Sequence, residues 1–190
     1  MSRIDITDAQ REKLGKLLDT VWEMQKVKRV VGFKRREDMW DGLVVPAVEL
    51  LQAMEFKPGW QVVDVGSGAG FPGMVMAIMQ QDLQLTLLDS TTRKCTIMEE
   101  IKRRLELPVQ IACGRAEDEK WAGRFDAAVA MWLGSLNCAE RIMRNMVRSG
   151  GLVAIITGLG DKAEYIPPGF EQKALDEHHT VIYGIVSRET

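Results

Sequence analysis

The stretch that decides the fold is residues 62–73, which read VVDVGSGAGFPG. A β-branched apolar run containing the acid Asp64 gives way to glycines at alternate positions, and an apolar helical pattern follows. This order predicts a strand, a tight turn and a helix, with which a doubly wound α/β sheet holds a nucleoside-containing ligand. Glycine suits such a turn because the backbone must lie against the ligand without a Cβ between them.

Two cofactor classes compete for a turn of this kind. Residues 68–73 contain a literal G-x-G-x-x-G, and Asp89 follows at a distance typical of NAD-linked oxidoreductases. However, Asp64 would repel a pyrophosphate, and Pro72 lacks the N–H that a helix N-terminus offers to phosphate. S-adenosylmethionine carries a positive sulfonium and ammonium and no phosphate, so the sequence favours it. A glycine-rich turn without a ligand is the remaining alternative.

Length and composition narrow the class of protein. The 190 residues predict one domain, and a net charge of −2 means that nucleic acid could be bound only through a local basic patch. The three cysteines contain no C-x-x-C pair, which argues against a disulfide framework and a zinc site. The N-terminus has no apolar leader, and no apolar run has membrane-spanning length. We therefore expect a cytoplasmic protein without a metal.

We expect the chain to divide into an N-terminal helical extension, residues 1–58, and an S-adenosylmethionine-binding core, residues 59–190. In the extension, Thr7 and Gln10 have the spacing of a capping box, and a second helix over residues 37–54 is interrupted by Pro46. In the core, strand and helix patterns alternate, which predicts a parallel α/β sheet. The core strands are expected at residues 61–65, 84–88, 109–112, 125–130 and 152–157.

The helices between these strands are expected at residues 72–79, 92–106 and 136–147, and the last of them is expected to stop at Ser149-Gly150-Gly151 with a glycine C-cap. Two closely spaced strand patterns, at residues 170–175 and 180–187, predict a terminal antiparallel hairpin. The fold class is therefore α/β, a Rossmann-like doubly wound sheet with a terminal antiparallel hairpin.

Ligands of open α/β sheets bind beyond the carboxyl ends of the strands. Asp89 ends one strand and can accept hydrogen bonds from two ribose hydroxyls. Ala116 and Glu117 are placed to meet the adenine, although Glu117 could equally be a surface carboxylate in an acidic run. The candidate cofactor-binding residues are Asp64, Gly66, Ser67, Gly68, Gly70, Phe71, Asp89, Ser90, Ala116, Glu117 and Met131.

No general acid or base stands out, so the catalytic residues stay unknown. The two histidines, His178 and His179, lie between late strands and read as a polar turn. Methyl transfer to a ring nitrogen with a lone pair requires only alignment of the reactants. Residues 26–36 are locally basic and predict either a solvated helix end or a phosphate-binding patch. The candidate RNA-binding residues are Arg29, Lys34, Arg35 and Arg36.

Several motifs together resemble the RsmG (GidB) family. They are DVGSGAGFPG at residues 64–73, LLDS at 87–90 and GRAE at 114–117, and the resemblance covers roughly residues 10–160. Members methylate N7 of a guanine in small-subunit ribosomal RNA with S-adenosylmethionine. The resemblance therefore implies a class I methyltransferase fold, that cofactor, the same reaction, and ribosomal RNA or the small ribosomal subunit as partner.

The chain departs from the family pattern at polar positions. It has Arg29-Val30-Val31 in place of an Asn-Leu-Thr, GLVVP at residues 42–46 in place of a His-x-x-Asp-Ser, and Thr157-Gly158 in place of a lysine. After the fourth strand, Met131-Trp132 replaces an arginine and could floor a pocket for a flatter substrate, or simply pack. The alternatives are a methyltransferase of a small molecule or protein, and a cofactor-binding, RNA-contacting module without transfer.

Overall fold

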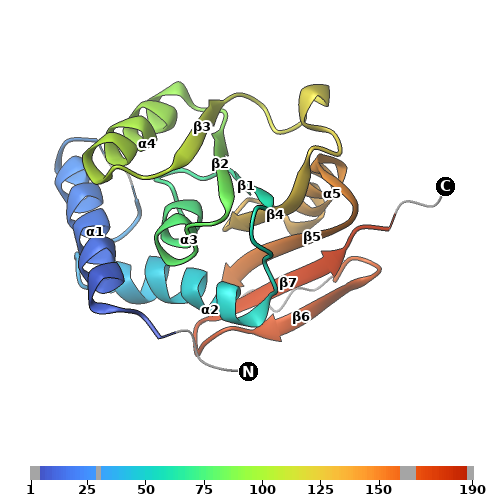
Figure 1. Cartoon of the computed structure of the whole chain (residues 1–190), viewed down its shortest axis with the longest axis horizontal. Helices are drawn as coiled ribbons and strands as arrows, with labels where there is room; N and C mark the ends of the chain where they lie inside the picture. Colours follow the sequence, from blue (N-terminus) through green and yellow to red (C-terminus); the bar gives the residue numbers. More distant parts are fainter. Residues whose placement is uncertain (1–4, 29–30, 159–165, 188–190) are drawn as a thin grey trace.

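The computed structural model describes residues 5–28, 31–158 and 166–187. Its centre is a seven-stranded sheet in the order β3-β2-β1-β4-β5-β7-β6 (Figure 1). All neighbouring strands pair in parallel except at β7, which runs antiparallel to both β5 and β6. The strands are β1 Gln61–Val65, β2 Gln84–Asp89, β3 Val109–Cys113, β4 Phe125–Met131, β5 Val147–Gly158, β6 Phe170–Ala174 and β7 His179–Ile185. The predicted doubly wound sheet with a terminal hairpin is confirmed.

Helices cover both faces of the sheet. Alternate strand residues point to opposite faces, so that Val62 joins one hydrophobic cluster and Val63 joins another. The first cluster includes residues of α1, α2, α3 and α4, and the second includes residues of α5. The helices are α1 Asp8–Lys28, α2 Val45–Ala53, α3 Gly73–Met79, α4 Thr92–Leu105 and α5 Leu136–Met146. None of the helices in the described residues is long and apolar enough to span a membrane.

The N-terminal helices form as their local sequence predicts. The backbone N–H of Gln10 donates to Oγ1 of Thr7 at 3.2 Å, and the N–H of Thr7 donates to Oε1 of Gln10 at 3.0 Å, which completes the capping box. Trp40–Val44 forms a π-helical turn directly before α2, where Pro46 occupies the first turn. A proline has no N–H to continue the regular ladder, which accounts for the irregularity.

The expected glycine cap of α5 is wrong. The helix ends at Met146, and the next residue, Val147, is already extended and pairs with Phe125 of β4. Gly150, with φ of +81°, lies inside β5, where the register with β4 shifts between Phe125 and Ala127. Full burial of the Val147 side chain explains why strand pairing prevails here over a continued helix turn.

Candidate cofactor pocket

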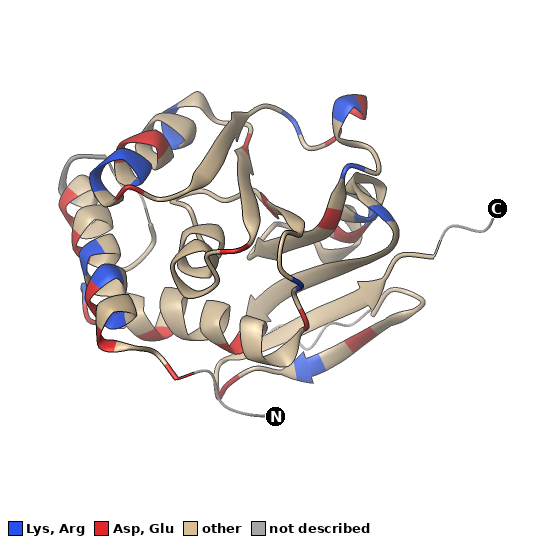
Figure 2. Cartoon of the chain, viewed as in Figure 1, with Lys and Arg blue, Asp and Glu red and all other residues tan. Residues whose placement is uncertain are grey.

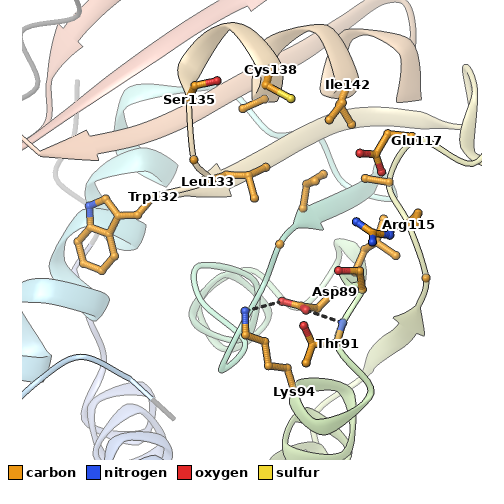
Figure 3. A pocket seen from close by; sticks show the side chains of 18 residues that line it. Asp89, Thr91, Lys94, Arg115, Glu117, Trp132, Leu133, Ser135, Cys138 and Ile142 are labelled. Atoms are coloured by element: carbon orange, nitrogen blue, oxygen red, sulfur yellow. Dashed lines mark hydrogen bonds and ion pairs between the residues drawn. The ribbon is translucent and has the colours of Figure 1, made fainter. Parts of the chain in front are cut away.

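A cavity of about 460 Å³ lies at the carboxyl ends of the parallel strands, which is a normal size for a small-molecule site. Its wall includes Gly66 after β1. Asp89 at the end of β2, Glu117 after β3 and Trp132 after β4 also line it (Figure 3). Residues of α5 close it on a further side. The order of strands reverses between β1 and β4, and ligands of doubly wound folds bind at that reversal.

The turn after β1 is a glycine cradle tied to the neighbouring strand. Gly66 and Gly68 have φ of +71° and +60°, a conformation that L side chains rarely adopt. A Cβ on Gly66 would lie 2.4 Å from Cδ1 of Leu133, so the space is already taken by the segment after β4. The N–H groups of Gly66 and Ser67 donate to the carbonyl of Leu88 at 2.7 and 3.1 Å. These bonds fix the turn against β2.

Asp89 connects the glycine turn to the start of α4. Its carboxylate is only 4% exposed, and its two oxygens accept the N–H groups of Thr91 at 2.9 Å and Gly68 at 3.1 Å. Oδ2 also lies 3.3 Å from Nζ of Lys94, whose side chain is about half exposed. A carboxylate offers about four lone-pair positions, so acceptor capacity remains for a ligand at the wall of the cavity.

Asp64, in β1, is hydrogen-bonded to the residue that begins α3. It is completely buried, its Oδ2 accepts the N–H of Gly73 at 2.9 Å, and Oδ1 has no hydrogen-bond partner. Burial raises the pKa of this carboxyl to about 7, with a smaller contribution from the charge of Asp89. The hydroxyl of Ser67 donates to the backbone carbonyl of Asp64 at 2.8 Å. Asp64 therefore fastens α3 to β1 and leaves one oxygen that a positive group would stabilise.

Comparisons with known proteins identify the family of the chain. A family model described as rRNA small subunit methyltransferase G matches residues 10–182. The chain belongs to this family. The ribosomal RNA small subunit methyltransferase G of Aquifex aeolicus is 29% identical over 165 residues, which is 85% of this chain and 82% of that protein.

The protein of the same name from Moorella thermoacetica is 32% identical over 134 residues, 68% of this chain. The match spans 56% of that relative's length. Among solved structures, a SAM dependent methyltransferase from Aquifex aeolicus superimposes with a TM-score of 0.61 at 15% identity, covering 78% of this chain and 93% of that one. That likeness shows the fold.

Five of the predicted cofactor residues of this methyltransferase G family member line the cavity: Gly66, Asp89, Ser90, Ala116 and Glu117. The other predicted residues lie outside the lining, and all but Gly68 are buried: Asp64, Ser67, Gly68, Gly70, Phe71 and Met131. Their roles in binding stay predictions. Gly68 is nevertheless connected to the cavity wall, because its backbone N–H donates to the carboxylate of Asp89.

Sequence reasoning missed the contribution of α5 and the segment before it. Leu133, Ser135, Cys138 and Ile142 line the cavity (Figure 3). They carry no motif, and the available signal was only their position after the fourth strand. No group of three or more His, Cys, Asp or Glu side chains suited to a metal ion occurs in the part of the chain that the structure describes.

The predicted RNA-binding residues of this family member fall into different environments. Arg29 lies outside the described residues. Arg35 pairs with Asp38 at 2.5 Å. Arg36 pairs with Asp19 of α1 at 2.8 Å. Lys34 is exposed and has no ion pair within residues 5–28, 31–158 and 166–187. Figure 2 shows Lys and Arg interspersed with Asp and Glu along α1 and α4, so those helices do not form a uniformly basic face.

Proposed function

We propose that this chain is an S-adenosylmethionine-dependent methyltransferase that acts on small-subunit ribosomal RNA, at N7 of a guanine. The observation that carries the proposal is the hydrogen bond from the N–H of Gly68, in the glycine turn, to the carboxylate of Asp89. The chain in which this bond occurs belongs to the methyltransferase G family. A ribosomal substrate would place the enzyme in the cytoplasm.

The residues of the cavity suit this cofactor. Asp89, Ala116 and Glu117 line the same cavity, and we assign Asp89 to the ribose hydroxyls and Ala116 with Glu117 to the adenine. The glycine turn lets the ligand approach the backbone. When bound, S-adenosylmethionine would supply a methyl group on a positively charged sulfur.

The order of the strands indicates how the cofactor would be oriented along the cavity. Glu117 follows β3, Asp89 ends β2, Gly66 follows β1 and Trp132 follows β4, and these strands are neighbours in that order. A cofactor with its adenine near Glu117 and its ribose at Asp89 would therefore extend its reactive end toward Gly66 and Trp132. The acceptor would enter from the β4 side.

The chemistry at the β4 end fits an acceptor that needs no base. Residues 132–135 read WLGS and contain no titratable side chain. The ring of His179 lies 6.0 Å from that of Trp132, but His179 is buried and its Nδ1 is paired with Asp176. N7 of guanine carries a free lone pair, so the protein has only to align it with the methyl group. An amine acceptor would require removal of a proton and is less suited to this segment. Lys34 could neutralise a phosphate of the RNA.

The test is transfer of labelled methyl from S-adenosylmethionine to small-subunit RNA from cells that lack this methylation. Asp89→Asn serves as the cofactor-site control, and the labelled nucleotide is mapped by nuclease digestion and alkaline sensitivity. We expect label at N7 of one guanine with the natural chain and a strong loss with the variant. Cofactor binding by calorimetry without label in RNA would overturn the substrate proposal and direct the search to small molecules and proteins.

A further inference from the structure

An exposed tryptophan stands at the β4 end of the cavity. Trp132 is 48% exposed and has φ of +55°, which is rare and strained for a bulky side chain. The backbone N–H of Trp132 donates to the carbonyl of Ile156 at 3.1 Å, and the backbone carbonyl of Trp132 accepts the N–H of Gly134 at 3.2 Å. Strained residues persist where their surroundings fix them, and they cluster at functional sites. Here the fixed backbone holds an open indole at the pocket.

Two further aromatic rings surround the indole. The ring of Phe33 lies 6.5 Å from that of Trp132 at 44°, and the ring of His179 lies 6.0 Å away at 37°. His179 is buried, and its Nδ1 lies 2.8 Å from Oδ2 of Asp176. Tilted contacts of this kind favour a fixed position of the indole. About half of the Trp132 surface stays open to solvent.

The three rings come from distant parts of the chain. Phe33 belongs to the N-terminal extension, Trp132 follows β4 and His179 begins β7. Phe33 immediately precedes Lys34, the exposed and unpaired cation among the described candidates. Proteins hold an unpaired base by stacking it on an aromatic ring and its backbone by basic side chains, and Lys34 is the residue that follows one of the three rings in sequence. In Figure 3 the indole lies at one end of the cavity, and Glu117 lies at the other.

We propose that Trp132, held by Phe33 and His179, is the stacking surface for the acceptor base, which must be unpaired to reach it. This inference rests on the proposed function because it assumes that the reactive end of the cofactor points toward β4. It assigns a binding role to a position at which the chain differs from the family pattern. An indole can also face a cation, and contact with the sulfonium of the cofactor is the competing role.

Fluorescence tests stacking without turnover. A short single-stranded RNA with one guanosine is titrated into the natural chain and into Trp132→Phe, both saturated with S-adenosylhomocysteine. We expect saturable quenching of tryptophan emission in the natural chain and loss of that component in the variant. Equal quenching in both proteins, or none in the natural chain, would overturn the inference. Since this readout needs no methyl transfer, its failure is distinct from a failure of the proposed reaction.

Kinetics then separate the two roles of the ring. In Trp132→Leu we expect kcat/KM for RNA to fall about 10-fold to 100-fold, the range expected when one stacked base loses its aromatic partner. Trp132→Phe should recover much of the loss, and the Kd for S-adenosylmethionine should change less than about twofold in both variants. A parallel loss of cofactor affinity, or equal damage from Leu and Phe, would contradict stacking on the base.

Trp60 offers a matched control. It is partly buried, precedes β1 and therefore lies at the opposite end of the sheet, where its ring contacts Phe56 at 6.4 Å. Trp60→Leu removes the same amount of aromatic surface far from the cavity. We expect its kcat/KM for RNA, measured on folded protein, to stay within about twofold of the natural value. A loss equal to that of Trp132→Leu would show a general effect of removing a tryptophan and would overturn the assignment.

Discussion

The two ends of the cavity are built in different ways. The end at β1 and β2 consists of a glycine turn and one carboxylate, joined by backbone hydrogen bonds such as that from Gly68 to Asp89. The end at β4 consists of side chains, with Trp132 between Phe33 and His179. The first construction depends on backbone geometry and one acid, whereas single substitutions of side chains can change the second.

The largest effect is expected at the backbone-built end. In Asp89→Asn an amide nitrogen must face one of two N–H groups that now donate to the carboxylate, those of Gly68 and Thr91. A ribose hydroxyl that donates to the Asp89 carboxylate would also lose a charge-assisted hydrogen bond, at a cost of about 2 kcal/mol, or roughly 30-fold in the Kd for S-adenosylmethionine. Calorimetric titration measures it.

The control for this change is Asp82→Asn, because Asp82 is an exposed acid at the other end of β2. Its cofactor affinity should match that of the natural chain. If Asp89→Asn also binds the cofactor normally, Asp89 is only a brace of the loop and the site assignment is wrong.

The next effect concerns pH and the buried acid. The folded chain keeps the Asp64 proton up to a pKa of about 7, whereas the ordinary value is 3.8. The folded state therefore binds more protons than the unfolded state between these values, and stability falls as pH rises through this range. The slope from this group approaches about 1.4 kcal/mol per pH unit and vanishes above pH 7.

Urea unfolding of the natural chain and of Asp64→Asn at pH 5.5 and 7 would measure this slope. The variant should lack the Asp64 contribution and show a smaller fall in the free energy of unfolding. Identical pH dependence in both proteins would mean that Asp64 is ionised in the fold.

A smaller effect separates two glycines of the same turn. Both Gly66→Ala and Gly68→Ala place a side chain at positive φ, at a cost of about 1–2 kcal/mol. A Cβ on Gly66 would also meet Leu133 at 2.4 Å, whereas the nearest atom to a Cβ on Gly68 is 3.8 Å away. Thermal unfolding should show the larger destabilisation for Gly66→Ala, and equal losses would mean that Leu133 moves aside freely.

The contrast between the two ends also explains what the sequence could predict. The glycine turn, Asp89 and the strand order follow from local patterns, because each pattern acts within one β-α-β unit. The environment of Trp132 depends on Phe33 and His179, which lie about a hundred and about fifty residues away, and no spacing rule relates such positions. The same holds for Arg36, whose pairing with Asp19 could not be read from a basic run. The boundary between an extension and a core at residues 58 and 59 stays a prediction.

The smallest effect is expected in the basic segment. Lys34→Ala should weaken RNA binding a few-fold and lower the salt dependence of affinity by about one phosphate contact. Arg36→Ala should instead lower stability, since this guanidinium holds Asp19 and the carbonyl of Gly15 on α1. Filter binding across a salt series, together with thermal unfolding, distinguishes them. Reversed outcomes would move the RNA contact from Lys34 to Arg36.

The most direct test varies both substrates in steady-state methyl transfer for the natural chain, Asp89→Asn and Trp132→Leu. If the two ends of the cavity serve different ligands, Asp89→Asn raises the KM for S-adenosylmethionine and leaves the KM for RNA near its natural value. Trp132→Leu does the opposite. If both variants raise both constants to the same degree, the cavity is one undivided site and the division into cofactor and acceptor ends is wrong.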